Sequence, residues 1–343
     1  MSRNIKQNSI TSPEKTAKIN KNNIRLMEDF LLYLASVQKA ESTINAYRSD
    51  LLIVFTYILD NLDNKDFVSL SKRDISAMQN WMVISNGNSS ARVRRIKAAM
   101  SSLSNFIENM CDDDPEFKDF RSIVRKIENP VLQPSQEKTV WDDDELADLL
   151  DKLTYAGQYD KACALALGMY SGRRKSELCR FSVDDFKDEN LVCDGALYKT
   201  SKAIRTKGRG GGKYIYCYTL AKKFKPYLDR WLKYREENGI DSEWLFVSGN
   251  ERNKQLLPTT LTSWAHTFSA ITGREFYWHS LRHYYTTSLV RAGLPDSVIQ
   301  DIVGWDSADM CRLYTDIDAD ERISMYFKDG EIDTGNNKSL SDL

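Results

Sequence analysis

A polar, proline-containing segment divides this chain into two parts with different patterns. ENPVLQPSQEKTV (128–140) holds two prolines and few apolar residues, a composition that favours an extended linker. The chain has 343 residues, more than one ordinary core organises. We therefore expect two domains joined by a linker over residues 131–141.

The part before the linker shows only helical periodicity. In IRLMEDFLLYLASV, apolar residues fall on one stripe, as in an amphipathic helix: Leu26, Phe30, Leu31, Leu34 and Val37. Later helices are expected to begin at Ser42 or Thr43 and near Ser71, which are good N-cap residues. We predict an all-helical domain over residues 24–130, preceded by a flexible tail over residues 1–23.

The part after the linker combines helices with a few short strands. DENLVCDGALYK and IRTKGRGGGKYIYCYTL have the composition of strands, with GRGGG as a loop between two of them. Helical patterns follow over residues 221–238, 258–271, 280–292 and 295–303. We predict a mainly α chain whose second domain, residues 142–328, is mostly helical with a small antiparallel β-sheet. A disordered tail is expected over residues 329–343.

Composition argues against several classes of protein. No apolar run reaches the roughly 18 residues that a membrane-spanning helix needs, and the polar N-terminal stretch lacks the apolar centre of a secretory signal. The six cysteines form no CxxC pair, which argues against a zinc site and a disulfide framework. We therefore expect a cytoplasmic protein without a bound metal.

Charge is balanced overall but unevenly distributed. The net charge is −1, yet basic residues cluster in RVRRIK (92–97) and between residues 199 and 213, while acidic residues cluster in DDDPE and WDDDE. Segregated charge permits a DNA-binding face on a neutral protein. The alternative is a set of ordinary solvated faces.

The stretch HSLRH holds two of the three histidines of the chain around an arginine. Histidines four residues apart share a helix face, as in HExxH zinc sites. That motif needs a glutamate where Ser280 stands, which argues against a metal. A phosphate site is the better hypothesis, because His279 would lie near a helix N-terminus and Arg282 offers a planar fork. The structural alternative makes His279 a cap and pairs Arg282 with a carboxylate.

Three other segments carry side chains suited to phosphate chemistry. In SGRRKSE, Glu177 can hold Arg174 in one rotamer, although this spacing is also typical of an ordinary helix ion pair. In TKGRGGGK, a lysine on a glycine-rich turn can protonate a leaving oxygen or simply be solvated. In VGWDSADMCRLYTDID, Tyr314 is either a nucleophile or a buried helix residue.

Together these motifs resemble the tyrosine recombinase (phage integrase) family, and in particular simple recombinases of the Cre and Xer type. The family pattern is an arginine in GxRxxE, a hairpin lysine, HxxR, Gly-His or Gly-Trp, and a tyrosine. This sequence has SGRRKSE, TKG, HSLR, VGW and LYTD in that order. Each motif alone is weak, but five in this order are specific. The resemblance covers nearly the whole chain, since the first domain resembles the family's core-binding domain.

The resemblance implies that two arginines bind the scissile phosphate. These would be Arg282 and Arg174, the latter chosen over its neighbour Arg173 because it fits GxR and lies three residues before Glu177. Glu177 would support Arg174, and His279 would act as a general acid–base and phosphate contact. No role follows for His283 beyond supporting the helix.

The resemblance also implies the groups that make and break bonds. Tyr314 would be the nucleophile, forming a 3′-phosphotyrosyl link, and Lys207 would protonate the leaving 5′ oxygen. Lys207 is chosen among the hairpin lysines because TKG resembles the family's GKG; the others are Lys199, Lys202 and Lys213. Trp305 would replace the family's second histidine and donate a hydrogen bond from its indole.

Partners follow from the same resemblance. It implies a double-stranded DNA site, four identical protomers on two such sites, no cofactor, and a bacterial or phage-encoded protein associated with the nucleoid. It is compatible with an accessory DNA-bending or directionality factor. DNA contacts are expected from basic residues of the first domain and of the hairpin: Arg92, Arg94, Arg95, Lys97, Lys199, Lys202, Arg205 and Arg209.

Two other functions fit the same residues. A type IB topoisomerase uses similar chemistry without a partner site, and would relax supercoiled plasmid of any sequence. A non-catalytic DNA-binding protein could retain the fold, although the complete set of catalytic residue types argues against it. A telomere resolvase is disfavoured because such chains are usually longer.

Overall fold

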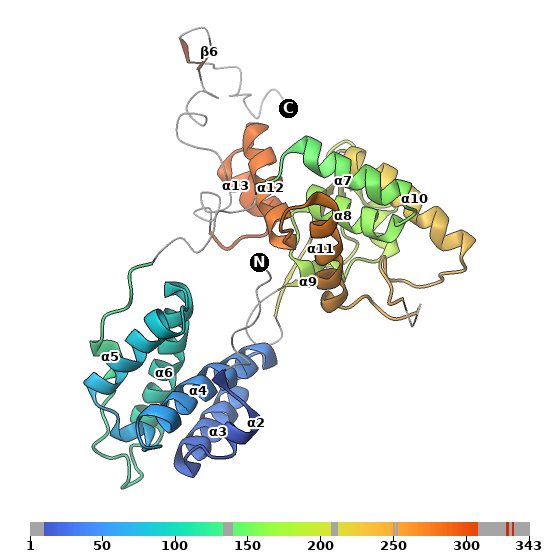
Figure 1. Ribbon diagram of the computed structural model, residues 1–343. Helices are drawn as coiled ribbons and strands as arrows, with labels where there is room; N and C mark the ends of the chain where they lie inside the picture. Colours follow the sequence, from blue (N-terminus) through green and yellow to red (C-terminus); the bar gives the residue numbers. More distant parts are fainter. Residues whose placement is uncertain are drawn as a thin grey trace. The chain divides into compact units, whose positions relative to one another are not determined.

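The computed structural model describes residues 10–132, 140–206, 212–249, 251 and 253–307, and the strands β6 (Phe327–Lys328) and β7 (Glu331–Ile332). The described residues fall into two compact units (Figure 1), one ending before residue 133 and one beginning at residue 140. Each unit has an apolar core of its own.

The first unit is built from helices, and residues 10–132 contain no strand. Its elements are α2 (Pro13–Thr16), α3 (Lys21–Ser36), α4 (Glu41–Asn61), the 3-10 turn η1 (Phe67–Ser69), α5 (Lys72–Asn80), the π turn η2 (Trp81–Ser85), α6 (Ser90–Met110) and the 3-10 turn η3 (Val124–Lys126). Helices α3, α4 and α6 pack on one another and enclose the core.

The apolar stripe of α3 faces this core. Phe30 packs on Tyr47 and Phe106, with ring centroids 5.4 and 5.6 Å apart. Val37, which the periodicity placed on the stripe, is 46% exposed because α3 ends at Ser36. Burial along the rest of the stripe supplies most of the driving force that holds α3 in place.

The helix starts depart from the sequence expectations in one place. Ser71 caps α5 in a capping box with Asp74, as predicted. Helix α4 instead starts after Ala40, which makes no side-chain cap bond, so neither Ser42 nor Thr43 is its cap. Ser42 and Thr43 lie within the first turn of α4, one to two residues after its start at Glu41. Because their side chains are typical of N-caps, the sequence pattern placed the helix start too late.

Residues 10–23 are more ordered than the predicted tail. Ile19 is buried, and Asn20 donates to the carbonyl of Asn64 at 3.0 Å and to the carboxylate of Asp66 at 2.8 Å. Asn23 is buried and accepts from the Phe67 amide at 2.7 Å. These side-chain bonds reach more than 40 residues along the chain, so a local pattern gives no sign of them.

The second unit is mostly helical with short antiparallel strands, which confirms the predicted fold class. Its elements are α7 (Asp143–Tyr155), α8 (Tyr159–Ser171), α9 (Lys175–Leu178), the 3-10 turns η4 (Val183–Phe186) and η5 (Asp188–Asn190), β1 (Leu191–Val192), β2 (Leu197–Lys199), β3 (Ile204–Thr206), β4 (Lys213–Ile215), β5 (Tyr218–Leu220), α10 (Ala221–Glu237), α11 (Pro258–Thr272), α12 (Trp278–Arg291) and α13 (Asp296–Val303).

Strands β1 to β5 form two small sheets, and β6 pairs with β7 in a third. One has the order β1-β2-β5, and the other is the hairpin β3-β4, in which Thr206 lies opposite Lys213 and Ile204 opposite Ile215. In the described part of the hairpin, β3 ends at Thr206 and β4 begins at Lys213. Residues 207–211 lie outside the described part of the chain.

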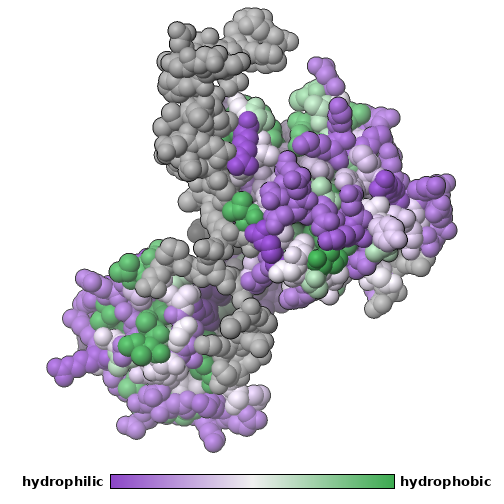
Figure 2. Space-filling model, turned by 45° about the horizontal axis from the view of Figure 1, so that its top comes forward, coloured by the Kyte–Doolittle hydropathy of each residue, from purple (hydrophilic) through white to green (hydrophobic). Residues whose placement is uncertain are grey.

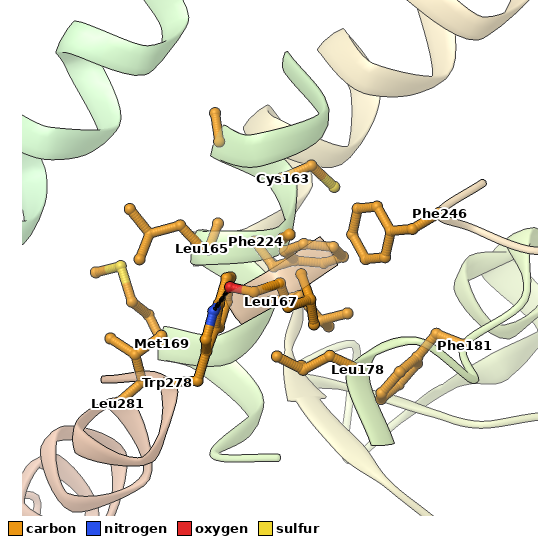
Figure 3. Packing of buried hydrophobic residues seen from close by; sticks show 14 of the residues in the cluster. Cys163, Leu165, Leu167, Met169, Leu178, Phe181, Phe224, Phe246, Trp278 and Leu281 are labelled. Atoms are coloured by element: carbon orange, nitrogen blue, oxygen red, sulfur yellow. Dashed lines mark hydrogen bonds between the residues drawn. The ribbon is translucent and has the colours of Figure 1, made fainter. Parts of the chain in front are cut away.

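Helix α8 is the centre of the second core. All its residues from Ala162 to Met169 are buried, and α7, α10 and α12 pack against it. A helix that is apolar on all sides must be surrounded by protein. Figure 3 shows its side chains between Phe224 and Phe246 on one side and Trp278 and Leu281 on the other.

The described helices are too short or too polar to cross a membrane. On the face shown in Figure 2, hydrophilic side chains predominate over both units, and hydrophobic side chains form only small patches. Among the described cysteines, all of which are free thiols, Cys163, Cys179 and Cys217 are buried and pack as small apolar residues.

Gly172 ends α8 in a conformation that a side chain would oppose. Its φ is 60°, in the left-handed region, and a Cβ at this position would overlap the ring of Tyr285 on α12. Gly273 ends α11 with a similar φ of 70°, but a Cβ there would meet nothing within 4 Å. Substituting alanine at each glycine therefore distinguishes the cost of backbone strain, present at both positions, from the cost of a packing overlap, present only at Gly172.

We expect Gly172→Ala to destabilise the protein more than Gly273→Ala. Gly273→Ala should cost about 1 kcal/mol for the left-handed backbone, and Gly172→Ala a further 1–3 kcal/mol or so for the overlap with Tyr285. Urea unfolding monitored by circular dichroism measures both. Equal losses of unfolding free energy in the two variants would show that the Tyr285 ring moves away from the added Cβ at no energetic cost.

Candidate active site

Arg174 lies at the junction of α8 and α9. It is the N-cap residue of α9, and its guanidinium contacts Glu177 Oε1 at 3.1 Å and the Thr206 hydroxyl at 3.2 Å. Its side chain is 31% exposed, whereas that of Glu177 is 1% exposed. A half-buried guanidinium held by a buried carboxylate has one edge fixed and another open to an anion.

Glu177 is held ionised by its neighbours. Burial alone would raise its pKa, but the hydrogen bond donated by the Thr206 hydroxyl and the charges of Arg173 and Arg174 outweigh burial, so that the pKa of Glu177 lies below its usual value. The carboxylate therefore contributes stability above its ordinary pKa, and this contribution is lost as the pH falls through the lowered value. Thr206, at the end of β3, thereby ties the hairpin to the arginine.

Arg282 projects from α12 and is completely buried. Its guanidinium donates to the carbonyl of Gly172 at 3.0 Å and to the carbonyl of Val303 at 3.2 Å, and it lies 5.4 Å from the centre of the Trp305 ring. Both carbonyls are at helix C-termini, those of α8 and α13, where the unsatisfied carbonyls and the helix dipole favour a cation. This compensates the cost of burying the charge.

His279 is the second residue of α12 and lies on the same side as Arg282. Its ring meets that of His283 edge to face, with centroids 5.5 Å apart. Desolvation, followed by the charges of His283, Arg282 and Arg174, lowers the pKa of His279 to about 4. The imidazole is therefore neutral at pH 7 and can accept a proton.

Trp305 follows α13 and is 6% exposed. Just after it, Asp306 forms an ion pair with Lys213 of β4 at 2.5 Å. The β3-β4 hairpin, which carries Lys213, therefore contacts the segment that continues towards residue 314. Because both side chains are well exposed, with Asp306 at 89%, this pair adds little stability.

The structure thus brings four of the predicted catalytic residues to one place: Arg174, His279, Arg282 and Trp305. Lys207, Arg209 and Tyr314 lie outside the described residues. Of the predicted DNA contacts near the hairpin, Lys202 and Arg205 are exposed, and the Lys199 ammonium lies 4.5 Å from the centre of the Tyr216 ring.

The basic run of α6 is used largely within the first unit. Arg92 and Arg95 both pair with the buried carboxylate of Asp50, at 2.5 and 3.0 Å, and Arg94 donates to the carbonyl of Pro130 at 2.9 Å. These three arginines are at least partly exposed, so a DNA contact stays open to them.

Lys97 corrects the sequence prediction. It is 4% exposed, and its ammonium donates to the Gln79 side chain and to the carbonyls of Ile127 and Glu128 at 2.8–2.9 Å. Desolvation, followed by the charge of Arg94, lowers its pKa. With its three donors used inside the unit, Lys97 joins α6 to the chain that leaves it and does not reach a DNA backbone.

Two residues escaped the sequence analysis. Thr206 bonds both Glu177 and Arg174, and Arg173 is completely buried, as Arg282 is. Nothing in a local pattern marks the threonine. For Arg173, the adjacency of two arginines was a signal, but only one was expected to have a role.

Comparison with known proteins agrees with this geometry. Residues 139–321, more than half of the chain, match the model of the phage integrase family. The chain belongs to this family. The recombinase-like protein YomM, derived from the SPbeta prophage of Bacillus subtilis, is 28% identical over 249 residues, covering 71% of this chain and 72% of the relative. The tyrosine recombinase XerA of Pyrococcus horikoshii is 23% identical over 300 residues, covering 86% and 90%.

A solved structure shows the same fold. This chain superimposes on a chain of a lambda integrase tetramer bound to a Holliday junction with a TM-score of 0.62 and 18% identity, covering 87% of this chain and 77% of that chain. At this identity the likeness concerns the fold alone. The family match and the tyrosine recombinases among the relatives identify the chain as a tyrosine-type site-specific recombinase.

We expect NMR titration of the imidazole resonances to give His279 a pKa near 4 in the DNA-free recombinase. Because unfolding restores a pKa of about 6.5, the unfolded chain takes up the proton first as the pH falls, so His279 lowers stability as the pH falls from 6.5 to 4. His279→Gln should flatten the pH dependence of urea unfolding in this window.

The exposed His266 of α11 supplies the matched control, because His266→Gln removes an imidazole that is not part of the site. The chain has only three histidines, so single substitutions assign all the resonances. An His279 pKa of 6 or more would contradict the desolvated, cation-flanked site.

Proposed function

We propose that this recombinase cleaves and rejoins DNA strands through a covalent 3′-phosphotyrosyl intermediate, with Tyr314 as nucleophile. The observation that carries the proposal is the convergence of Arg174 and Arg282, from two distant segments, beside a neutral imidazole. Two guanidiniums suit the nonbridging oxygens of a phosphodiester, whose negative charge increases in the transition state.

Bond making and breaking then follow from the chemistry of the remaining groups. The Tyr314 oxygen attacks phosphorus and the bond from phosphorus to the 5′ oxygen breaks. The neutral imidazole of His279 accepts the tyrosine proton, and Lys207 donates a proton to the leaving 5′ oxygen. The indole N–H of Trp305 donates to a nonbridging oxygen, which adds charge stabilisation without proton transfer.

Rejoining reverses these steps. The free 5′ hydroxyl of a partner strand attacks the phosphotyrosyl ester and returns a proton to the lysine. The bond from phosphorus to the Tyr314 oxygen breaks, and the imidazolium of His279 returns the proton to that oxygen. The ester conserves the energy of the broken phosphodiester, so ligation needs no nucleotide cofactor. Binding of a phosphate beside His279 would raise its pKa from about 4, because an anion favours the imidazolium form.

The two units would divide the work. We infer that residues 24–130 form a core-binding DNA-binding domain and residues 142–328 the catalytic domain, joined by the linker over residues 131–141. Basic residues of both would contact the phosphate backbone: Arg92, Arg94, Arg95, Lys199, Lys202, Arg205 and Arg209. Such a protein acts where the nucleoid is, in the cytoplasm.

Assembly is part of this proposal. The lambda integrase that shares the fold was solved as a tetramer on a Holliday junction, and four protomers on two DNA sites are the arrangement that strand exchange between duplexes requires. The target duplex would belong to a mobile element or replicon that is integrated, excised or resolved. An accessory DNA-bending or directionality factor is compatible with this scheme.

We expect Tyr314→Phe to abolish a covalent protein–DNA adduct that the wild type forms. Nicked duplexes from both flanks of the recombinase's own gene serve as substrates, because the nick lets the cleaved fragment diffuse away and leaves the adduct. Denaturing gels then reveal it. Tyr155→Phe is the control, since Tyr155 is 97% exposed on α7 and should keep the wild-type adduct yield.

The alternatives give other results. An adduct that persists in Tyr314→Phe would assign the nucleophile elsewhere. Relaxation of any supercoiled plasmid at the same rate as cleavage of the flanking duplexes would favour a type IB topoisomerase. Tight, sequence-specific binding without adduct in the wild type would favour a non-catalytic DNA-binding protein.

A further inference from the structure

Arg173 is a completely buried charge that the proposed mechanism does not use. Its guanidinium donates to the carbonyl of Ser171 at 3.1 Å, to the sulfur of Cys217 at 3.5 Å, and to the carbonyl of Ile302. These partners lie at the end of α8, between β4 and β5, and in the last turn of α13. One side chain thus joins three elements that are distant in sequence.

Arg173 and Arg282 bind neighbouring carbonyls at both helix ends. At the end of α8, Arg173 donates to the carbonyl of Ser171 and Arg282 donates to the carbonyl of Gly172. In the last turn of α13, Arg173 donates to the carbonyl of Ile302 and Arg282 donates to the carbonyl of Val303. Two guanidiniums therefore bridge the same two C-termini in parallel. Each supplies donors for carbonyls that have no partner within their own helix.

The elements that Arg173 joins carry the site. Only Gly304 separates Trp305 from α13. Gly304 packs so closely that a Cβ there would lie 2.7 Å from the Ile215 side chain and 3.5 Å from the Arg173 guanidinium. The hairpin strand β4, which ends at Ile215, pairs with the strand that carries Thr206. A shift at Arg173 would thus reach both the tryptophan and the support of Arg174.

We propose that Arg173 is a positioning residue that holds the C-termini of α8 and α13 together, so that Arg282 and Trp305 are fixed for the phosphate. This inference rests on the proposed function, because it assigns Arg173 to the geometry of that reaction. Arg173 touches no reacting atom, and its effect passes through the carbonyls of Ile302 and Ser171.

Arg173→Met and Arg173→Lys provide the test. Methionine fills a similar volume but leaves the carbonyls of Ser171 and Ile302 without donors, so the helix ends should move apart. A displacement of about 1 Å at a reacting group can cost about 100-fold in rate. Lysine keeps the positive charge but lacks the planar set of guanidinium donors, so Arg173→Lys should recover part of the rate that Arg173→Met loses.

Arg235 offers a matched control in the same unit. It is 4% exposed on α10, and its guanidinium donates to the carbonyls of Trp244, Leu245 and Ser242 at 2.5–2.7 Å. Arg235→Met therefore also removes a buried guanidinium from backbone carbonyls, but away from the site. A role in stability alone would affect the two methionine variants alike.

The first measurement uses the free protein and needs no DNA. We expect Arg173→Met to shift the indole N–H resonance of Trp305 and the imidazole resonances of His279 in two-dimensional NMR, at a temperature where the variant is folded. Arg235→Met should leave both at their wild-type positions. Unchanged Trp305 and His279 resonances in folded Arg173→Met would overturn the inference.

The second measurement is the rate of adduct formation on the nicked duplex that traps the wild type, with protein in excess over DNA. Arg173→Met should slow this rate about 100-fold while changing the dissociation constant for the duplex less than about threefold. Arg173→Lys should be intermediate, and Arg235→Met close to wild type.

A wild-type cleavage rate in Arg173→Met would refute the positioning role while leaving the proposed function intact. A wild type that forms no adduct would refute the proposed function instead, and the NMR comparison would still decide on Arg173.

Discussion

The site depends on cations placed where two helices end. Carbonyls at the C-terminus of an α-helix lack partners in the helix and carry partial negative charge. Here α8 and α13 bring such carbonyls together, and the buried guanidiniums of Arg173 and Arg282 occupy the space between them. The carbonyls make burial of the arginines tolerable, and the arginines satisfy the carbonyls, so neither arrangement would be stable without the other.

Much of the fold was predictable because its signals are local. The stripe of α3, the capping box at Ser71 and the αL glycine after α8 all appear within a few residues. The order of the five motifs sufficed to name Arg174, His279 and Arg282, which the structure places together. Arg174 stands at the start of α9, and His279 and Arg282 lie three residues apart on α12.

What the sequence could not provide are bonds that join distant segments. The contact of Arg173 with Ile302 spans 129 residues, and the bonds of Asn20 and Asn23 to the loop after α4 span more than 40. Lys97 of α6 was misassigned for the same reason, because its ammonium is engaged by one amide and two carbonyl oxygens that a local pattern does not reveal. The partly exposed arginines of the same run stay candidates for DNA contact, although Arg92 and Arg95 also pair with Asp50.

Helix α9 is too short to exist without support. Four residues cannot repay the cost of forming a first helical turn, and Arg174 stands at its start. Its rigidity comes from α8, which precedes it and is surrounded by protein on every side. The proposed catalytic arginine therefore lies at the border between an enclosed helix and a short turn that has little stability of its own. Substitutions deep in α8, far from any phosphate, would act on the reaction by changing how often that border opens.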